Sequence, residues 1–408
     1  MKRNIFNKIN ELLFMFPVVA IIGVRQCGKT TLSKVLRPDW VYIDLEKPSD
    51  FNQLDIDPEF FFQQHPHHVI IDEAQLSPKI FEVLRSVIDA QRSTTGRFIL
   101  TGSSSLELIK QISETLAGRI AIVELGTFKA NELVGKPLSP LYQMLQSPLT
   151  AEMLNTLPEP LLTSENIKSA WINGGYPEPN LRGSHQFYLQ WMENYEATYI
   201  HRDIAKLYPK LNKVAYQRFL SMLCKLSGTI LNKSDVARGL EVSEGAIREY
   251  LTIAEGTFLW RSVLSYENSI SQSIIKMPKG HLRDTGLLHT LLNITSATQL
   301  YKDPIIGHSF EGFVIEELIK GLQATMLTRW TYYYYRTRSG AEVDFILQGP
   351  FGTIPIEIKY GVDTKPKILK NLRNFIIENK LPFGLLINQS EKACWLDRYI
   401  FQLPAMYL

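Results

Sequence analysis

The sequence predicts an α/β fold made of several domains, and three observations carry that prediction. Strand and helix patterns alternate from residue 1 to about residue 128, which is typical of a parallel sheet with crossover helices. A glycine-rich loop joins a buried strand pattern at residues 16–22 to a helix pattern at residues 30–36. Strand patterns return near the C-terminal end, at residues 332–338, 341–347 and 354–360.

A chain of 408 residues exceeds what one hydrophobic core usually supports, so roughly two to four domains are expected. Changes in pattern place the boundaries near residues 130, 210 and 295. We expect an α/β core at 1–130, a helical lid or linker region at 131–210, a helix-turn-helix region at 211–295 and a second α/β domain at 296–408.

The glycine-rich loop reads Gly-Val-Arg-Gln-Cys-Gly-Lys-Thr at residues 23–30 and fits the phosphate-binding P-loop pattern G-x-x-x-x-G-K-[ST]. Its backbone N–H groups can turn inward around phosphate oxygens, and the positive end of the following helix adds to that field. Lys29 is expected to reach the β/γ-phosphates, and Thr30 to hold Mg²⁺ through its hydroxyl. The predicted nucleotide-binding residues are Gly23, Arg25, Gln26, Cys27, Gly28, Lys29, Thr30 and Thr31.

Two adjacent acids end the next buried strand pattern, at residues 67–73. In a P-loop enzyme the first of them, Asp72, helps to hold Mg²⁺ through water. The second, Glu73, can orient and deprotonate an attacking water, which suits hydrolysis as well as binding. The alternative is a strand with a solvated acidic end.

A third strand pattern at residues 97–102 ends in Ser103. In an open α/β sheet, ligands bind at the carboxyl edge of the strands, so Ser103 is expected beside the first two motifs. We predict that it senses the γ-phosphate or the attacking water, with an ordinary Ser/Gly turn as the alternative.

These motifs together resemble a family of bacterial and archaeal AAA+-type ATPases. The resemblance rests on the segments at 23–31, 70–75, 100–104 and 116–119, and it continues through 174–178, 284–288 and 336–345. It therefore covers almost the whole chain, and Val24 and Cys27 stand at variable positions of the family's P-loop. The resemblance implies ATP as the nucleotide and suggests Arg119 as the arginine that contacts the γ-phosphate, in cis or from a neighbouring subunit. A surface arginine at the end of a helix is the alternative.

The segment 232–251 reads as helix, turn, helix, with Ser234 and Ser243 as candidate N-caps. An alternating strand pattern at residues 258–264 follows, so the region looks like a winged helix. In a DNA-binding version the second helix enters the major groove, but here it offers only Arg248 as a cation, beside acids. DNA binding and a structural or protein-contact role both stay open for this helix.

A second constellation lies in the C-terminal strands. Glu357 and Lys359 share one face of a strand, and Asp344 can lie beside them on the neighbouring strand. With Glu311 from an upstream helix, which fits better than Glu316, this order resembles the PD-(D/E)xK nuclease superfamily. The resemblance implies that the three carboxylates hold Mg²⁺ while Lys359 positions its water. A solvated E-x-K face without cleavage activity is the alternative.

Composition favours a cytoplasmic protein. Three cysteines, Cys27, Cys224 and Cys394, have neither metal nor disulfide spacing, which indicates a reducing compartment. The charged and apolar start of the chain imitates a signal peptide but runs directly into the P-loop strand, and no apolar run approaches the length that spans a bilayer. The net charge of +3 is too small to indicate nucleic-acid binding by itself.

The sequence therefore predicts a Mg²⁺-dependent ATPase whose hydrolysis rearranges the C-terminal modules, with DNA as the expected target in repair, recombination or defence. Two alternatives stay open: an ATP-controlled switch for a protein partner with an inactive nuclease-like domain, and an ATP-regulated metal-dependent endonuclease. No membrane partner is expected. An arginine acting in trans would require a homo-oligomer.

Overall fold

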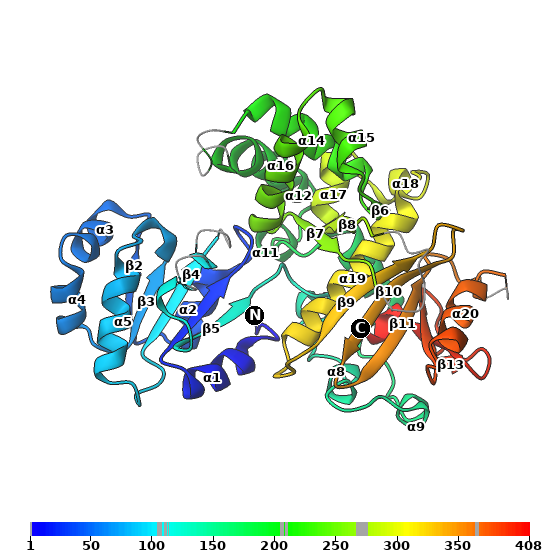
Figure 1. The fold of residues 1–408 in the computed structure, drawn as a ribbon, viewed down its shortest axis with the longest axis horizontal. Helices are drawn as coiled ribbons and strands as arrows, with labels where there is room; N and C mark the ends of the chain where they lie inside the picture. Colours follow the sequence, from blue (N-terminus) through cyan, green and yellow to red (C-terminus); the bar gives the residue numbers. More distant parts are fainter. Residues whose placement is uncertain are drawn as a thin grey trace. The chain divides into compact units, whose positions relative to one another are not determined.

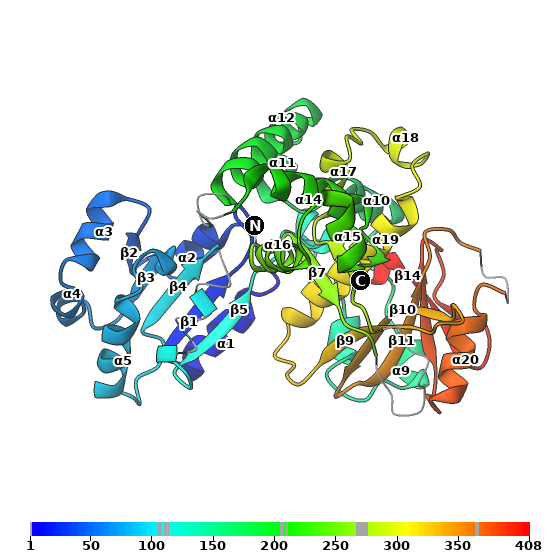
Figure 2. The same ribbon diagram turned by 45° about the horizontal axis from the view of Figure 1, so that its top comes forward.

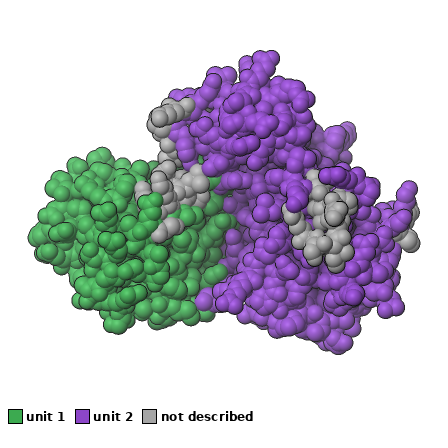
Figure 3. Space-filling model, in the orientation of Figure 1, with its two compact units in different colours: residues 1–127, 256–258 green, residues 128–255, 259–408 purple. Residues whose placement is uncertain are grey.

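The computed structural model describes residues 2–103, 108–109, 112, 114–204, 208, 211–266, 276–363 and 367–408. The chain forms two compact units, residues 1–127 with 256–258, and residues 128–255 with 259–408 (Figure 3). Both units contain a sheet with helices, so the predicted α/β fold class is confirmed (Figure 1). No helix within the described ranges is both long and apolar enough to cross a membrane.

The first unit is built on a parallel five-stranded sheet in the order β2-β3-β4-β1-β5. Its strands are β1 (Val18–Ile22), β2 (Val41–Asp44), β3 (Val69–Asp72), β4 (Phe98–Gly102) and β5 (Ile120–Glu124). Its helices are α1 (Phe6–Met15), α2 (Lys29–Leu36), α3 (Pro48–Asp55), α4 (Pro58–Gln64), η1 (Ala74–Leu76) and α5 (Ile80–Ala90). Strands β3, β4 and β1 lie next to one another in this sheet (Figure 2). They are buried along their whole length, which explains their unbroken apolar patterns.

The second unit begins with helices that connect to two further sheets. They are α7 (Ala130–Leu133), α8 (Leu141–Met144), α9 (Ala151–Asn155), α10 (Ser164–Asn173), α11 (Pro177–Leu181), α12 (His185–Tyr195) and η2 (Glu196–Asp203). Three helices then pack with a small antiparallel sheet in the order β6-β8-β7. The helices are α14 (Lys213–Lys225), α15 (Lys233–Leu240) and α16 (Glu244–Gly256), and the strands are β6 (Thr229–Ile230), β7 (Trp260–Val263) and β8 (Lys279–Leu282).

One helix start in this region differs from the sequence expectation. Asn232, not Ser234, caps α15, because its side chain accepts a hydrogen bond from the Ser234 backbone N–H at 3.1 Å. Ser234 instead donates its hydroxyl to Glu244, the first residue of α16, at 2.5 Å. Ser243 does accept the backbone N–H of Ala246 at 3.1 Å, as an N-cap residue would.

A mixed six-stranded sheet, β13-β14-β12-β11-β10-β9, ends the second unit. The elements are α17 (Thr285–Leu291), α18 (Ala297–Leu300), α19 (Ile306–Gln323), β9 (Thr331–Arg336), β10 (Glu342–Gly349), β11 (Gly352–Ile358), α20 (Lys370–Glu378), β12 (Gly384–Asn388), β13 (Cys394–Trp395), β14 (Ile400–Pro404) and η3 (Ala405–Tyr407). Val343 belongs to the apolar cluster that β10 forms with α20. Asp344, the next residue, instead accepts the backbone N–H of Ile358 at 2.8 Å and contacts Lys359 at 3.2 Å through its carboxylate.

Candidate functional site

The P-loop follows β1, near the centre of the parallel sheet, and α2 begins at its last residues. Gly28 has φ +96°, a left-handed conformation that side chains other than glycine rarely adopt. A Cβ at Gly23 would lie 2.1 Å from the carbonyl oxygen of Leu125, so this position also accepts only glycine. Lys29 is buried, and its Nζ donates to the carbonyl oxygens of Gly23 and Val24 at 3.0 and 3.1 Å.

The other predicted loop residues fall into two groups. Cys27 is fully buried and its Sγ donates to the carbonyl oxygen of Leu125 at 3.3 Å, so it packs inside the loop. Arg25 is partly exposed and pairs with Glu46 at 3.5 Å, whereas Gln26 and Thr31 are exposed. The loop therefore presents polar groups to solvent while its buried residues fix its shape.

Asp72, at the end of β3, comes together with Thr30. The Thr30 hydroxyl donates to Asp72 Oδ2 at 2.7 Å, and the Tyr42 hydroxyl donates to the same oxygen at 2.6 Å. Thr101 donates its hydroxyl to Asp72 Oδ1. Burial, followed by the hydrogen bond to Asp72, raises the pKa of Tyr42, so this phenol stays a donor. The hydroxyl of Thr30 and the carboxylate of Asp72 are hard oxygen ligands, which suit Mg²⁺.

Glu73 is held by neighbours on both sides. Its Oε2 accepts the backbone N–H and the hydroxyl of Ser103 at 3.1 and 2.8 Å, and the side-chain amide of Gln75 at 2.5 Å. Its own backbone is left-handed, with φ +53°, and its N–H donates to Thr101 Oγ1 at 3.2 Å. Ser103 therefore lies beside Glu73, while residues 104–107 lie outside the described part of the chain.

Arg119 lies elsewhere. It directly precedes β5, and Ile120 pairs with Val18, the first residue of β1. It is therefore at the amino edge of the parallel sheet, whereas the P-loop and Asp72 lie at the carboxyl edge. Its guanidinium makes a bidentate contact with Asp89 at 2.7 and 2.8 Å. The structure thus does not bring Arg119 to the phosphate-binding loop of its own chain, and only the expectation of a contact in trans stays open.

Sequence reasoning missed four side chains that support this site: Arg3, Tyr42, Gln75 and Thr101. Arg3 donates to the carbonyl oxygens of Cys27 and Gly126, both at 2.8 Å, and so joins the P-loop to the chain after β5. Thr101 could have been predicted, because it is the polar residue of the otherwise apolar strand β4 and directly precedes Gly102. Strand β4 pairs with β3, which ends in Asp72. No sequence signal identified Arg3, since 24 and 123 residues separate it from Cys27 and Gly126.

The C-terminal constellation is assembled, but with an additional cation. Four carboxyl groups and two lysines form what we call the acid cluster: Glu311, Glu342, Asp344, Glu357, Lys279 and Lys359. Lys279 Nζ lies 2.7 Å from Glu311 Oε1, 3.0 Å from Glu342 Oε1 and 3.9 Å from Asp344 Oδ1. Lys359 Nζ lies 3.2 Å from Asp344 Oδ2 and 2.6 Å from Glu357 Oε1. Glu316 points elsewhere, to Arg261 and His281.

Burial and neighbouring charges set the protonation of the acid cluster. Burial raises the pKa of Glu357 to about 8, and the Asp344 carboxylate adds to that shift. Burial alone would raise the pKa of Glu311, but Lys279, together with His308, outweighs burial and lowers that pKa to about 2. Burial disfavours the charge of Lys279, yet the carboxylates of Glu311 and Asp344 raise its pKa. Lys279 is thus a permanent cation among these acids.

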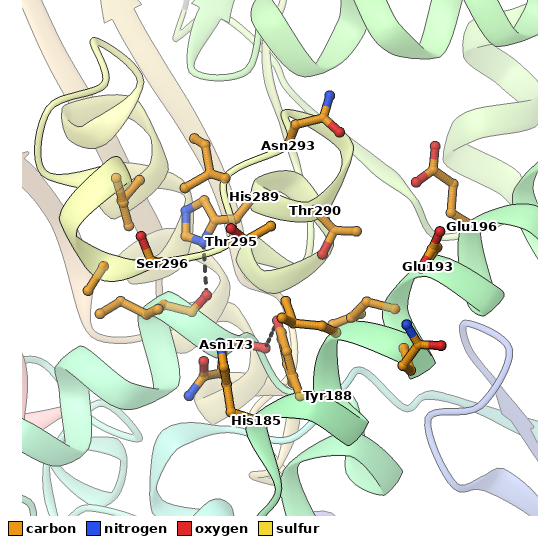
Figure 4. Close-up of a pocket in the computed structure, with 17 residues that line it drawn as sticks. Asn173, His185, Tyr188, Glu193, Glu196, His289, Thr290, Asn293, Thr295 and Ser296 are labelled. Atoms are coloured by element: carbon orange, nitrogen blue, oxygen red, sulfur yellow. Dashed lines mark hydrogen bonds between the residues drawn. The ribbon is translucent and has the colours of Figure 1, made fainter.

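A cavity of about 460 Å³ lies among α10, α12, α17 and the loop to α18 (Figure 4). His289 lines it and is itself buried: its Nδ1 lies 2.9 Å from the carbonyl oxygen of Ile172 and its Nε2 lies 2.7 Å from Ser309 Oγ. Trp171 donates its indole N–H to the same Oγ at 2.9 Å. Burial lowers the pKa of His289 to about 4, so the imidazole is neutral at physiological pH. We identified no chemistry in this cavity from the sequence.

Comparisons with known families divide the chain in three. Residues 15–134 match the model of a family described as an AAA domain, which supports an AAA-type ATPase domain in this part of the chain. Residues 164–298 match a domain of unknown function (DUF8612), and residues 306–408 match a second one (DUF4143).

Two relatives span nearly the whole chain. The uncharacterized proteins Rv2008c of Mycobacterium tuberculosis and Mb2031c of Mycobacterium bovis are each 29% identical over 410 residues, or 99% of this chain and 83% of theirs. Among solved structures, a Walker-type ATPase of Pyrococcus abyssi aligns at 16% identity with a TM-score of 0.46, over 70% of this chain and 94% of that chain. RuvB of Thermotoga maritima aligns at 17% identity with a TM-score of 0.31, over 63% and 88% respectively.

Proposed function

We propose that the first unit binds ATP with Mg²⁺ and hydrolyses it. One observation carries the proposal: Thr30, Asp72, Glu73 and Ser103 converge at the carboxyl edge of one parallel sheet, directly beside a P-loop whose lysine is buried. In this proposal Thr30 and Asp72 hold the metal, which supplies positive charge opposite the phosphates. Lys29 neutralises the phosphates, and Glu73 accepts the proton of the attacking water.

The contacts of Glu73 support a role as the base. A carboxylate that accepts three hydrogen bonds on a single oxygen, Oε2, leaves its other oxygen to receive a proton. Ser103 and Gln75 fix the orientation of that carboxylate, which is the positioning that general-base catalysis requires. In this role Ser103 acts on the reaction through Glu73.

The test is Mg²⁺-dependent release of phosphate from ATP by the full chain and three variants. Lys29→Ala should lose both ATP binding and hydrolysis. Glu73→Gln should keep ATP binding and lose turnover by about 100-fold or more, which is the usual range for a general base. Lys79→Ala is the matched control, because Lys79 is half exposed and pairs with Asp55 at 2.7 Å. Normal turnover by Lys29→Ala would exclude this site as the source of the activity.

For the second unit, we propose a nucleotide-controlled interaction with a protein partner. The expected resemblance of α14–α16 with β6–β8 to a winged helix, and of α19 with β9–β12 to the PD-(D/E)xK superfamily, stays a prediction. Two observations weigh against base reading and cleavage of DNA by these modules. Arg248, the cation offered by α16, lies 3.4 Å from Glu244 on the same helix. The acid cluster contains Lys279 among the carboxylates that a metal would need.

ATP turnover measured with and without duplex, single-stranded and branched DNA separates this proposal from a DNA-directed motor. The protein-switch proposal expects unchanged turnover and intact DNA. Stimulation by one form of DNA, with affinity that falls steeply as salt rises, would replace it with the DNA-directed function. Metal-dependent nicking that Lys359→Ala removes would instead establish a nuclease.

A further inference from the structure

Lys279 reaches the acid cluster because of its place on β8. Lys279 and His281 lie two residues apart on β8, so their side chains point to the same side, and Arg283 directly follows the end of the strand. All three side chains meet acids of α19: Lys279 contacts Glu311 at 2.7 Å, whereas His281 and Arg283 contact Glu316 at 3.1 and 3.6 Å. The contact of Lys279 is therefore one of three side-chain contacts through which this end of the small sheet meets the acids of α19.

The position of the ammonium group decides what else the acid cluster can bind. Lys279 Nζ lies within hydrogen-bond distance of oxygens from α19 and β10, and 6% of its side chain is exposed. A divalent cation would need these oxygens at about 2.0–2.6 Å, so it would have to share their centre with a fixed positive charge. Within the described residues, no three side chains of His, Cys, Asp or Glu are placed to hold a metal ion.

The acid cluster nevertheless retains an unused ligand atom. Glu357 Oε2 is buried and has no hydrogen-bond partner within the described part of the chain. Such an atom is costly to bury, and it lies in the carboxyl group that the sequence predicted as a metal ligand. The carboxyl groups of the predicted metal set are thus present and buried, while the ammonium group of Lys279, from another sheet, lies against those of Glu311 and Asp344.

We propose that Lys279 is the resident counter-ion of the acid cluster, so that the cluster excludes divalent metal and instead fastens the small sheet β6-β8-β7 to α19 and β10. This inference concerns the second unit and does not depend on ATP hydrolysis by the first. It assigns the acid cluster the role of a joint between two modules. The E-x-K pattern and Asp344 predict a metal site, but the observed arrangement does not fit a metal. The presence of Lys279 accounts for that difference.

Binding of Mn²⁺ to nucleotide-free protein, followed by electron paramagnetic resonance, tests the proposal. All proteins carry Asp72→Asn, which removes the carboxylate of the first site. The parent protein should show no saturable site that depends on the acid cluster. Lys279→Met should gain one Mn²⁺ per chain and lose it again when Asp344→Asn is added. Lys129→Met is the matched control, because it also removes a buried lysine but one that pairs with a single carboxylate, that of Glu317.

Two results would overturn the proposal. One is a folded Lys279→Met variant that gains no Mn²⁺ site. The other is a parent protein that already binds Mn²⁺ and loses at least about tenfold in affinity on Asp344→Asn, the scale of a lost metal-site interaction. The second comparison needs no change at Lys279, so it applies even where Lys279→Met does not fold. Absence of ATP turnover in the unaltered chain would contradict the proposed function of the first unit, but it would not affect the conclusion from Mn²⁺ binding to the acid cluster.

Discussion

The hydroxyl of Thr30 and the carboxylate of Asp72 meet at 2.7 Å, although 42 residues separate them along the chain. Thr30 comes from the first turn of α2, and Asp72 from the last position of β3. Their meeting follows from the parallel sheet, which brings the carboxyl ends of its strands to one edge. A hydroxyl and a carboxylate at that edge form the oxygen pair through which we propose that Mg²⁺ binds.

Substitutions at Thr30 should separate the need for its hydroxyl from the need for its methyl group. Thr30→Ser keeps an oxygen and should retain most of the ATP turnover. Thr30→Ala removes the oxygen and should raise the Mg²⁺ concentration needed for half-maximal turnover by more than about tenfold. Loss of even an outer-shell contact of a metal site typically lowers metal affinity by that much. Titration of turnover with Mg²⁺ at saturating ATP gives the measurement. Equal Mg²⁺ dependence in the two variants would contradict the assignment.

Ser103 should matter through the orientation of Glu73. Ser103→Ala removes the hydroxyl donor at 2.8 Å but keeps the backbone N–H at 3.1 Å and the amide of Gln75. Loss of one hydrogen bond to a charged group corresponds to about 1.5–3 kcal/mol, so kcat should fall by about tenfold or more while KM for ATP changes little. Steady-state kinetics of Ser103→Ala and Ser103→Thr measure this. An unchanged kcat would reduce Ser103 to a turn residue.

The nucleotide-binding edge was predictable because its motifs are local. The P-loop pattern, the acids after β3 and Ser103 after β4 are short segments, and the parallel sheet brings strand ends together without further information. Arg119 is different: the family resemblance suggested a γ-phosphate contact, but the register of β5 places this arginine at the opposite edge of the sheet. The predicted domain boundaries at 130, 210 and 295 stay predictions.

The acid cluster was predictable only in part, because the sequence did not indicate Glu342 or Lys279. Asp344 lies on β10 and Glu357 on the paired strand β11, which Lys359 directly follows, so the two-residue period of a strand was enough to place these three together. Lys279 lies 32 residues before Glu311 and on a different sheet from Asp344 and Glu357, and no local pattern connects Lys279 with Glu311. A long-range ion pair of this kind depends on how β8 packs on α19, which sequence periodicity does not specify.

Mixing two inactive variants tests whether Arg119 acts in trans. Arg119→Ala keeps an intact P-loop, and Lys29→Ala keeps an intact Arg119. If the arginine of one subunit serves the site of another, the mixture should hydrolyse ATP although each variant alone is nearly inactive. Turnover is measured at a fixed total concentration over a series of mixing ratios. Full activity of Arg119→Ala by itself would show that the contact with Asp89 is its whole role.

Removing one partner of the buried pair Lys129–Glu317 should strongly destabilise the second unit. The two side chains meet at 3.0 Å and are only 1% and 2% exposed. Lys129→Met leaves the carboxylate buried without its cation, which typically costs about 3–5 kcal/mol, whereas an apolar replacement of both partners is often nearly neutral. The free energy of unfolding is measured in urea for Lys129→Met and for the double variant Lys129→Met with Glu317→Leu. The double variant should recover most of the free energy that the single variant loses.

A surface pair provides the control for this experiment. Arg182 and Glu178 lie 3.2 Å apart with 61% and 45% of their side chains exposed. Arg182→Ala should change the free energy of unfolding by less than about 1 kcal/mol, the usual limit for an exposed ion pair. A comparable loss of unfolding free energy in Arg182→Ala and Lys129→Met would mean that burial does not determine how much these ion pairs contribute to stability.

His289 should make the stability of the second unit depend on pH. Burial lowers its pKa from 6.5 to about 4, while Asp284 and Asp303 oppose that shift only in part. Glu193, Glu196 and His185 line the same cavity. In the neutral tautomer the Nδ1–H donates to the carbonyl oxygen of Ile172, and Nε2 accepts the hydroxyl of Ser309. Protonation would turn Nε2 into a donor and break the second contact.

The sign of the effect follows from the two pKa values. As the pH falls below 6.5 the unfolded chain gains a proton on this imidazole, but the folded chain does not until about pH 4. The stability from His289 is therefore complete above 6.5 and is lost as the pH falls toward 4. From about pH 7.5 to about pH 5.5, the unmodified protein should lose about 1 kcal/mol more unfolding free energy than His289→Gln does. Parallel pH profiles in the two proteins, from urea unfolding followed by tryptophan fluorescence, would show that this imidazole is protonated equally in both states.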